Sequence, residues 1–168
     1  MNRWHIAQLN VGRAVAPVES AQLAPFIAAL DAINALADAA PGFVWRLQTA
    51  SGNATDVRPT EDAQFLVNMS VWSSVEALFD FVYRTAHTAV MARRREWFER
   101  PLEAYQVLWW VPAGHRPSVE EALERLAHVR RNGPSAWAFT FKERHPPPGE
   151  SGPLEDLRPE PGCVGWDS

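Results

Sequence analysis

The stretch that decides the fold is 64–72, which reads Gln-Phe-Leu-Val-Asn-Met-Ser-Val-Trp. Its side chains alternate in character, which predicts a β-strand because successive strand residues point to opposite faces of a sheet. One face, here called the apolar face, carries Phe65, Val67, Met69 and Val71. The other, here called the mixed face, carries Gln64, Leu66, Asn68, Ser70 and Trp72. We expect helices to cover the apolar face, and the mixed face to border a cavity or solvent.

The segments on both sides of this strand predict the rest of one α+β domain. Further strands are predicted at 4–11, 43–48, 106–111 and 137–141, and helices at 20–39, from 75, at 85–99 after a kink, and from 118 to 132. Ser-x-x-Glu capping boxes at 73–76 and 118–121 mark two of the helix starts. The order β-α-β-β-α-α-β-α-β begins as a ferredoxin-like split β-α-β fold, an antiparallel sheet with helices on one face.

A sheet covered on one face leaves the other for a partner. We therefore expect a homodimer in which two mixed faces close a dimeric α/β barrel around a cavity. The domain is predicted to span 1–144. Residues 145–168 are rich in Pro and Gly with little apolar content, which predicts a poorly ordered tail.

Composition excludes several classes of function. The chain of 168 residues has a net charge of −4, whereas nucleic-acid binders usually present a basic face. The one dense basic run, Arg93-Arg94-Arg95, is interpreted as the solvated side of a helix. Cys163 is the single cysteine, so the fold does not depend on a disulfide. No signal peptide and no apolar run of about 20 residues is found, and we expect a cytoplasmic protein with no membrane partner.

Motifs for cofactors and metals are absent from the sequence. There is no P-loop, no G-x-G-x-x-G, no G-x-S-x-G and no H-E-x-x-H. The spacing of His5, His115, His128 and His145 does not converge on a metal, so we expect no metal site built by the protein. The eight Trp residues suit either a core or a pocket for flat organic molecules.

Four segments together carry a family resemblance. They are 9–13 (Leu-Asn-Val-Gly-Arg), 41–47 (Pro-Gly-Phe-Val-Trp-Arg-Leu), 67–72 (Val-Asn-Met-Ser-Val-Trp) and 107–115 (Val-Leu-Trp-Trp-Val-Pro-Ala-Gly-His). The chain resembles, over about residues 4–142, a bacterial family known only as domain of unknown function 3291. That resemblance implies the dimeric α/β-barrel superfamily, which includes the antibiotic biosynthesis monooxygenases, and it implies no established reaction.

Asn68 and Trp72 resemble a pair found in one branch of this superfamily. The cofactor-independent, quinone-forming monooxygenases place an Asn and a Trp four residues apart on a sheet face, where the Asn donates a hydrogen bond to a substrate oxyanion. The resemblance implies Asn68 and Trp72 as catalytic residues that need no cofactor. Neighbouring candidates for binding an aromatic substrate are Asn10, Arg46, Ser70 and Trp110.

His87 resembles the haem ligand of a second branch. In the haem-degrading monooxygenases a small-residue pair precedes a haem-ligating His on a helix, as in Thr85-Ala86-His87 here, and a first-strand Asn corresponds to Asn10. The chain differs from them in a shorter distance between Trp72 and His87, and in Phe81 where they have a Trp.

Three hypotheses therefore stay open. We favour a small enzyme that binds or oxidises a flat aromatic molecule in the barrel cavity. The alternatives are a haem-binding or haem-degrading protein that uses His87, and a non-catalytic ligand-binding or scaffold dimer. In that last case Asn68 is a satisfied buried amide and His87 a packing residue.

Overall fold

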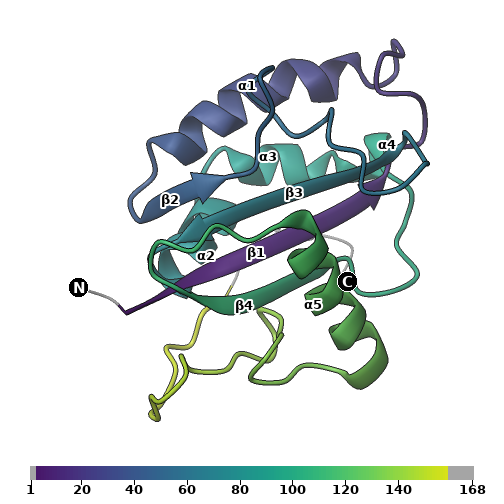
Figure 1. Ribbon diagram of the computed structural model, residues 1–168. Coiled ribbons are helices and arrows are strands. Elements are labelled where there is room, and N and C mark those ends of the chain that lie inside the picture. Colours follow the sequence, from purple (N-terminus) through teal and green to yellow (C-terminus); the bar gives the residue numbers. More distant parts are fainter. Residues whose placement is uncertain (1–2, 159–168) are drawn as a thin grey trace.

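The computed structural model describes residues 3–158 and shows an α+β arrangement (Figure 1). Within this range there are four strands and five helices. In chain order they are β1 (Trp4–Arg13), α1 (Ala24–Asp38), β2 (Phe43–Arg46), β3 (Phe65–Trp72), α2 (Val75–Arg84), α3 (His87–Ala92), α4 (Arg94–Trp97), β4 (Gln106–Pro112) and α5 (Val119–Asn132). None of these helices is both long and apolar enough to cross a bilayer.

The sheet is antiparallel throughout, with the strand order β2-β3-β1-β4. The register between β1 and β3 places Gln8 opposite Ser70 and Asn10 opposite Asn68. Directly opposite residues share a face, so these four polar side chains lie together in the middle of the mixed face.

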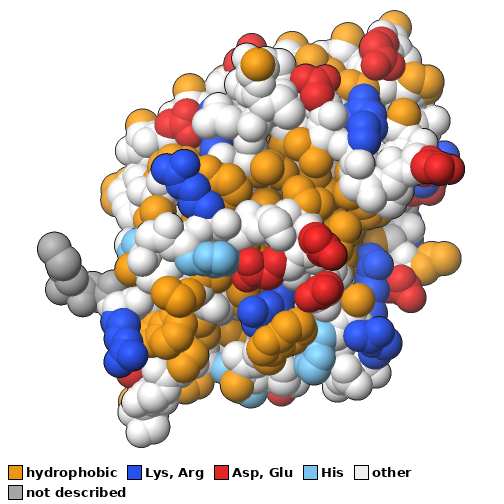
Figure 2. All heavy atoms as spheres, viewed as in Figure 1, with side chains coloured by type: hydrophobic (Ala, Val, Ile, Leu, Met, Phe, Trp, Pro, Cys, Tyr) orange, Lys and Arg blue, Asp and Glu red, His pale blue; other side chains and the backbone are white. Residues whose placement is uncertain are grey.

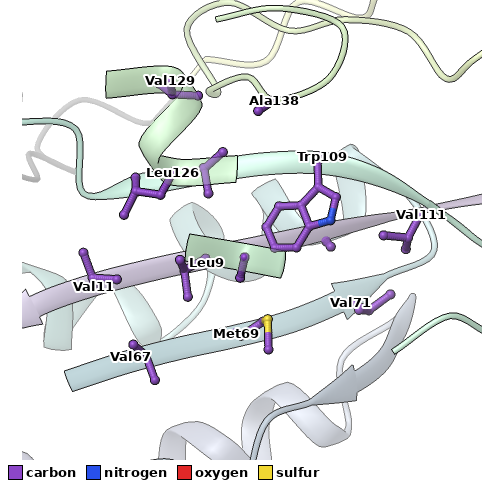
Figure 3. Close-up of a cluster of buried hydrophobic side chains, with 13 residues drawn as sticks. Leu9, Val11, Val67, Met69, Val71, Trp109, Val111, Leu126, Val129 and Ala138 are labelled. Carbon is purple, nitrogen blue, oxygen red and sulfur yellow. The ribbon is translucent and has the colours of Figure 1, made fainter. Parts of the chain in front are cut away.

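The apolar face forms the largest hydrophobic core, as the alternation predicted. Figure 3 shows its side chains pointing from three strands towards α5. The cluster consists of Ala7, Leu9, Val11, Val67, Met69, Val71, Val107, Trp109 and Val111 of the sheet, with Ala122, Leu126, Val129 and Ala138. Trp109 also donates a hydrogen bond from Nε1 to Glu121 Oε1 of α5, at 3.0 Å. This face is covered by the same chain.

Helices lie on both faces of the sheet, not on one as the sequence predicted. α5 covers the apolar face, while α1, α2 and α3 lie behind the sheet on the mixed face (Figure 1). Trp72 is fully buried against the α2 residues Leu78 and Phe81. The mixed face is therefore covered by helices of its own chain, and the prediction that it is the dimer interface is wrong. Homodimer formation itself stays a prediction.

The two ends of β3 explain why helices pack there. At one end Trp72 meets α2, whose buried residues share one stripe of the helix. At the other end Leu66 packs with Leu23, Trp97 and Phe98. Leu23 directly precedes α1, Trp97 is the last residue of α4, and Phe98 follows it. The helical layer is thus fixed above and below the polar middle of the mixed face.

Local sequence signals set the breaks between helices. Ser74, not Ser73, caps α2, because its Oγ accepts a hydrogen bond from the Ala77 amide at 3.1 Å. Ser118 caps α5 as predicted, with its Oγ 3.0 Å from the Glu121 amide. Thr85 is extended and ends α2, so the predicted kink is a complete break.

The predicted strand at 137–141 is reduced to a single bridge between Phe139 and Leu108. Their backbone groups exchange two hydrogen bonds of 2.8 and 2.9 Å. Next to the bridge, Ser135 and Ala138 bond each other in a turn, the Trp137 amide donates to Ser135 Oγ, and the Thr140 amide donates to the Glu143 oxygen. Phe139 is nevertheless fully buried.

The segment 145–158 contacts the domain through His145, Glu155 and Leu157. The indole of Trp110 donates from Nε1 to the backbone oxygen of His145 at 2.8 Å, and Leu157 packs against the buried cluster that contains Trp72 and Phe81. Cys163 lies outside the described residues, and the boundary at 144 stays a prediction. On the side of the molecule seen in Figure 2, the Lys and Arg side chains are interspersed with Asp and Glu.

Candidate functional site

The mixed face and the helices above it enclose a cavity of about 690 Å³. A second cavity of about 150 Å³ adjoins it and shares several lining residues, including Asn10, Arg46, Asn68, His87 and Arg94. Small-molecule sites commonly have volumes of about 300–1,000 Å³, so the larger cavity is of that size.

The polar middle of the mixed face forms one hydrogen-bonded row. Gln8 Nε2 donates to Asn68 Oδ1 at 2.8 Å and to Ser70 Oγ at 2.9 Å. Trp72 Nε1 donates to the same Ser70 oxygen at 2.8 Å. Gln8 and Ser70 are buried, whereas Asn68 is exposed although it lies in the middle of a strand. The Asn68 amide therefore faces the cavity, with its oxygen held by Gln8 and its NH2 group available to donate.

Trp72 is a buried part of the wall of the larger cavity. Its ring stacks on Phe81 with centroids 5.0 Å apart and meets Phe43 edge-on at 5.4 Å. No part of Trp72 is exposed. It lines the larger cavity and holds Ser70 through its Nε1, and its catalytic role stays a prediction.

His87 begins α3 and lines both cavities. Its Nδ1 lies 3.1 Å from the backbone oxygen of Val82, and because a carbonyl only accepts, Nδ1 carries the ring proton. Burial lowers the pKa of His87; the hydrogen bond to Val82 opposes this, and the nearby charge of Arg94 lowers the pKa further. The ring is thus neutral near pH 7, and Nε2 keeps a lone pair.

Arg94 is the cavity residue that the sequence analysis missed. Its guanidinium lies 5.2 Å from the centroid of the Phe98 ring and 4.8 Å from that of Tyr105. Nη2 donates to Asn10 Oδ1 at 3.2 Å and to the Val11 oxygen at 3.1 Å. Burial lowers the pKa of Arg94, although a guanidinium stays protonated in proteins.

A periodic signal for Arg94 was present in the sequence. Val90, Met91, Trp97 and Phe98 each lie three or four residues from Arg94, which places them beside it on one side of a helical segment. Arg94 falls inside this apolar stripe, while the neighbouring arginines do not. The interpretation of the whole basic run as solvated is therefore wrong for Arg94.

The remaining predicted site residues divide into two groups. Asn10 joins the cavity through Arg94, and Arg46 lines both cavities. The charge of Arg46 is already paired, because its Nε lies 2.7 Å from Asp38 Oδ1 and its Nη1 2.6 Å from the Gly52 oxygen. Trp110 is not among the residues that line either cavity. Across residues 3–158, no three His, Cys, Asp or Glu side chains are grouped as they would be to hold a metal ion.

Comparison with known proteins places the chain in a family. Residues 5–154 match the family described as "Domain of unknown function (DUF3291)". The chain belongs to this family. The crystal structure of a protein of unknown function from Nitrosomonas europaea is 16% identical, with a TM-score of 0.42, and the match covers 70% of this chain and 99% of that one. No curated protein matches the chain.

The pKa of His87 gives a testable pH dependence. Below about pH 6.5, the ordinary value for His, the unfolded chain binds a proton that folded His87 does not, so the free energy of unfolding falls as the pH falls. The His87→Gln variant should lose this component. Urea denaturation of this variant between about pH 6.5 and 5 measures how its free energy of unfolding changes with pH. That slope should be shallower than the wild-type slope by up to about 1.4 kcal/mol per pH unit.

The His115→Gln variant is the matched control, because His115 is exposed and does not line either cavity. It should leave the contribution of His87 in place. Identical slopes for wild type and His87→Gln would show that His87 titrates normally in the folded protein.

Proposed function

We propose that the protein binds a small, flat, aromatic molecule in the cavity between the mixed face and the helices α1, α2 and α3. The observation that carries this proposal is Asn68, an exposed amide in the middle of an otherwise buried strand, facing a cavity of about 690 Å³. Aromatic side chains line the same cavity: Phe79, Phe81, Tyr83, Tyr105 and Phe141. Apolar walls with a few fixed donors are what orient a planar polar molecule.

A monooxygenase-like reaction without a cofactor is compatible with these groups. A hydroxyarene and O2 would give a quinone and water, with one atom of O2 in each product. The NH2 group of Asn68 and the charge of Arg94 would stabilise the aryloxide that reacts, because hydrogen-bond donors and cations favour a developing oxyanion. The neutral His87, with Nε2 free of a proton, is the candidate base that would accept the hydroxyl proton.

We also propose that the fold is the ferredoxin-like split β-α-β of the dimeric α/β-barrel superfamily. The strand order supports this, since β1 and β2 are both antiparallel to the β3 strand between them. Membership implies a homodimer, whose interface then lies outside the mixed face.

The role of Asn68 is tested with 2-naphthamide as a neutral, flat probe. The Asn68→Ala variant should melt at nearly the wild-type temperature, because Asn68 is exposed, and should bind 2-naphthamide more weakly by about 1–3 kcal/mol in calorimetric titration. The matched control is Asn132→Ala, at the end of α5 and outside both cavities. Equal affinities for the two variants would remove Asn68 from the site.

Haem binding is the second candidate, and the geometry of His87 favours it. Haem-ligating His residues are neutral, and the second ring nitrogen commonly donates to a backbone oxygen, as Nδ1 does to Val82. His87 would suit a haem ligand in these respects. Haem would supply the oxygen chemistry, while the chain supplies His87, the apolar wall and Arg94.

Titration with hemin tests this candidate directly. If His87 ligates the iron, a one-to-one complex with a sharpened, shifted Soret band forms in wild type and is lost in His87→Ala. The control is His128→Ala, a histidine outside both cavities. A Soret band that is unchanged by His87→Ala would exclude His87 as the ligand.

A further inference from the structure

Within residues 3–158, Arg94 stands out because no carboxylate pairs with its charge. In the described part of the chain its hydrogen bonds go to two neutral oxygens, Asn10 Oδ1 and the Val11 carbonyl, and to no carboxylate. Nε is buried without a hydrogen-bond partner. A buried cation without an anion is costly, so such a group usually binds one when a ligand is present.

The charges around the cavities point the same way. Five basic residues line the larger cavity, namely Arg46, Arg94, Arg100, Lys142 and Arg144, against two acidic residues, Glu103 and Asp156. Both acids lie near arginines, because Glu103 is 3.4 Å from Arg130 and Asp156 is 2.8 Å from Arg158. The smaller cavity is lined by Arg94 and by Arg46, whose charge is paired with Asp38, and no acidic residue lines it. This excess of positive charge occurs in a chain whose net charge is −4.

The amides beside Arg94 are turned so that they donate. A guanidinium only donates, so the Asn10 atom that meets it is Oδ1, and the Asn10 NH2 group is left for another acceptor. In the same way Gln8 occupies Asn68 Oδ1 and leaves the Asn68 NH2 group facing the cavity. The NH2 groups of Asn10 and Asn68 therefore lie on the mixed face beside the positive charge of Arg94. This arrangement suits an anion that accepts several hydrogen bonds.

We infer that the ligand of this cavity is a planar aromatic anion whose carboxylate lies against Arg94, Asn10 and Asn68. This inference rests on the proposed binding of a flat aromatic molecule and adds the charge of that molecule. Charged N–H groups donate strongly to a carboxylate, and the two rings that flank Arg94 hold its guanidinium in place. An aromatic body would then extend along the wall that Phe81 forms.

The test compares two probes of one shape, 2-naphthoate and its neutral amide 2-naphthamide, by calorimetric titration at pH 7. Wild type should bind 2-naphthoate at least about 10-fold more tightly, because charged hydrogen bonds are about twice as strong as neutral ones. Arg94→Gln should weaken 2-naphthoate by about 10-fold or more and change 2-naphthamide by less than about 3-fold. Arg95→Gln is the matched control, since Arg95 is exposed and lines neither cavity, and it should bind both probes as wild type does.

The outcomes separate the two proposals. If neither probe binds wild type, the proposed function fails and the inference fails with it. If both probes bind equally well, the cavity binds flat molecules but the inference about charge is wrong. Arg94 also holds Asn10 and Val11, so Arg94→Lys serves if Arg94→Gln does not fold: it keeps the charge and should keep part of the preference for 2-naphthoate. The inference would be overturned if a folded Arg94→Lys variant lost all preference for 2-naphthoate over 2-naphthamide. It would also be overturned if the wild-type protein showed no such preference.

Discussion

The structure depends on how β3 is anchored at its two ends. Leu66 and Trp72 are buried beneath the helical layer, one against the segment around α4 and the other against α2. Between them Asn68 and Ser70 are polar, and packing an apolar helix directly on unpaired amides would cost several kcal/mol. The helices therefore meet the sheet at both ends and stand away from its middle. The cavity is a consequence of this pattern along a single strand.

The positive charge of Arg94 in that cavity lowers the stability of the folded protein. Arg94 is largely removed from water without a carboxylate partner, and its field helps to keep His87 neutral. Groups arranged in this way destabilise a folded protein unless they bind something, and they are more common at binding sites than in structural cores. By contrast, Arg46 lies close by and is neutralised by Asp38, which marks it as a structural support of the wall.

The sequence predicted the elements better than their relative placement. Strand periodicity assigned the residues of β3 to the correct faces, because that period depends only on backbone geometry. It could not say which helices cover which face, since both faces of the sheet present apolar side chains and both α2 and α5 bury residues. Resemblance to known enzymes indicated Asn68 and His87, which do share the cavity, whereas Trp110, a neighbouring candidate, does not line it. Arg94 lies in a run of three arginines, whose charge predicts a solvated helix side, whereas the spacing of Arg94 from the apolar residues around it predicts burial. The predicted strand around Phe139 is a single bridge, and the neighbouring amides of Trp137 and Ala138 bond to Ser135 in a local turn.

Thiol labelling of neighbouring β3 positions tests the central claim, that the mixed face borders an accessible cavity beneath helices while the apolar face is packed. Asn68→Cys and Met69→Cys are made with Cys163 changed to Ser, which leaves one thiol in each variant. In the folded protein, iodoacetamide should modify the Asn68→Cys variant much faster than the Met69→Cys variant, because residue 68 is exposed and residue 69 is buried. A bulky polyethylene glycol maleimide should react slowly with both, since the helices restrict access to residue 68. Equal rates with iodoacetamide at the two positions, or fast reaction of the bulky reagent at residue 68, would contradict this account.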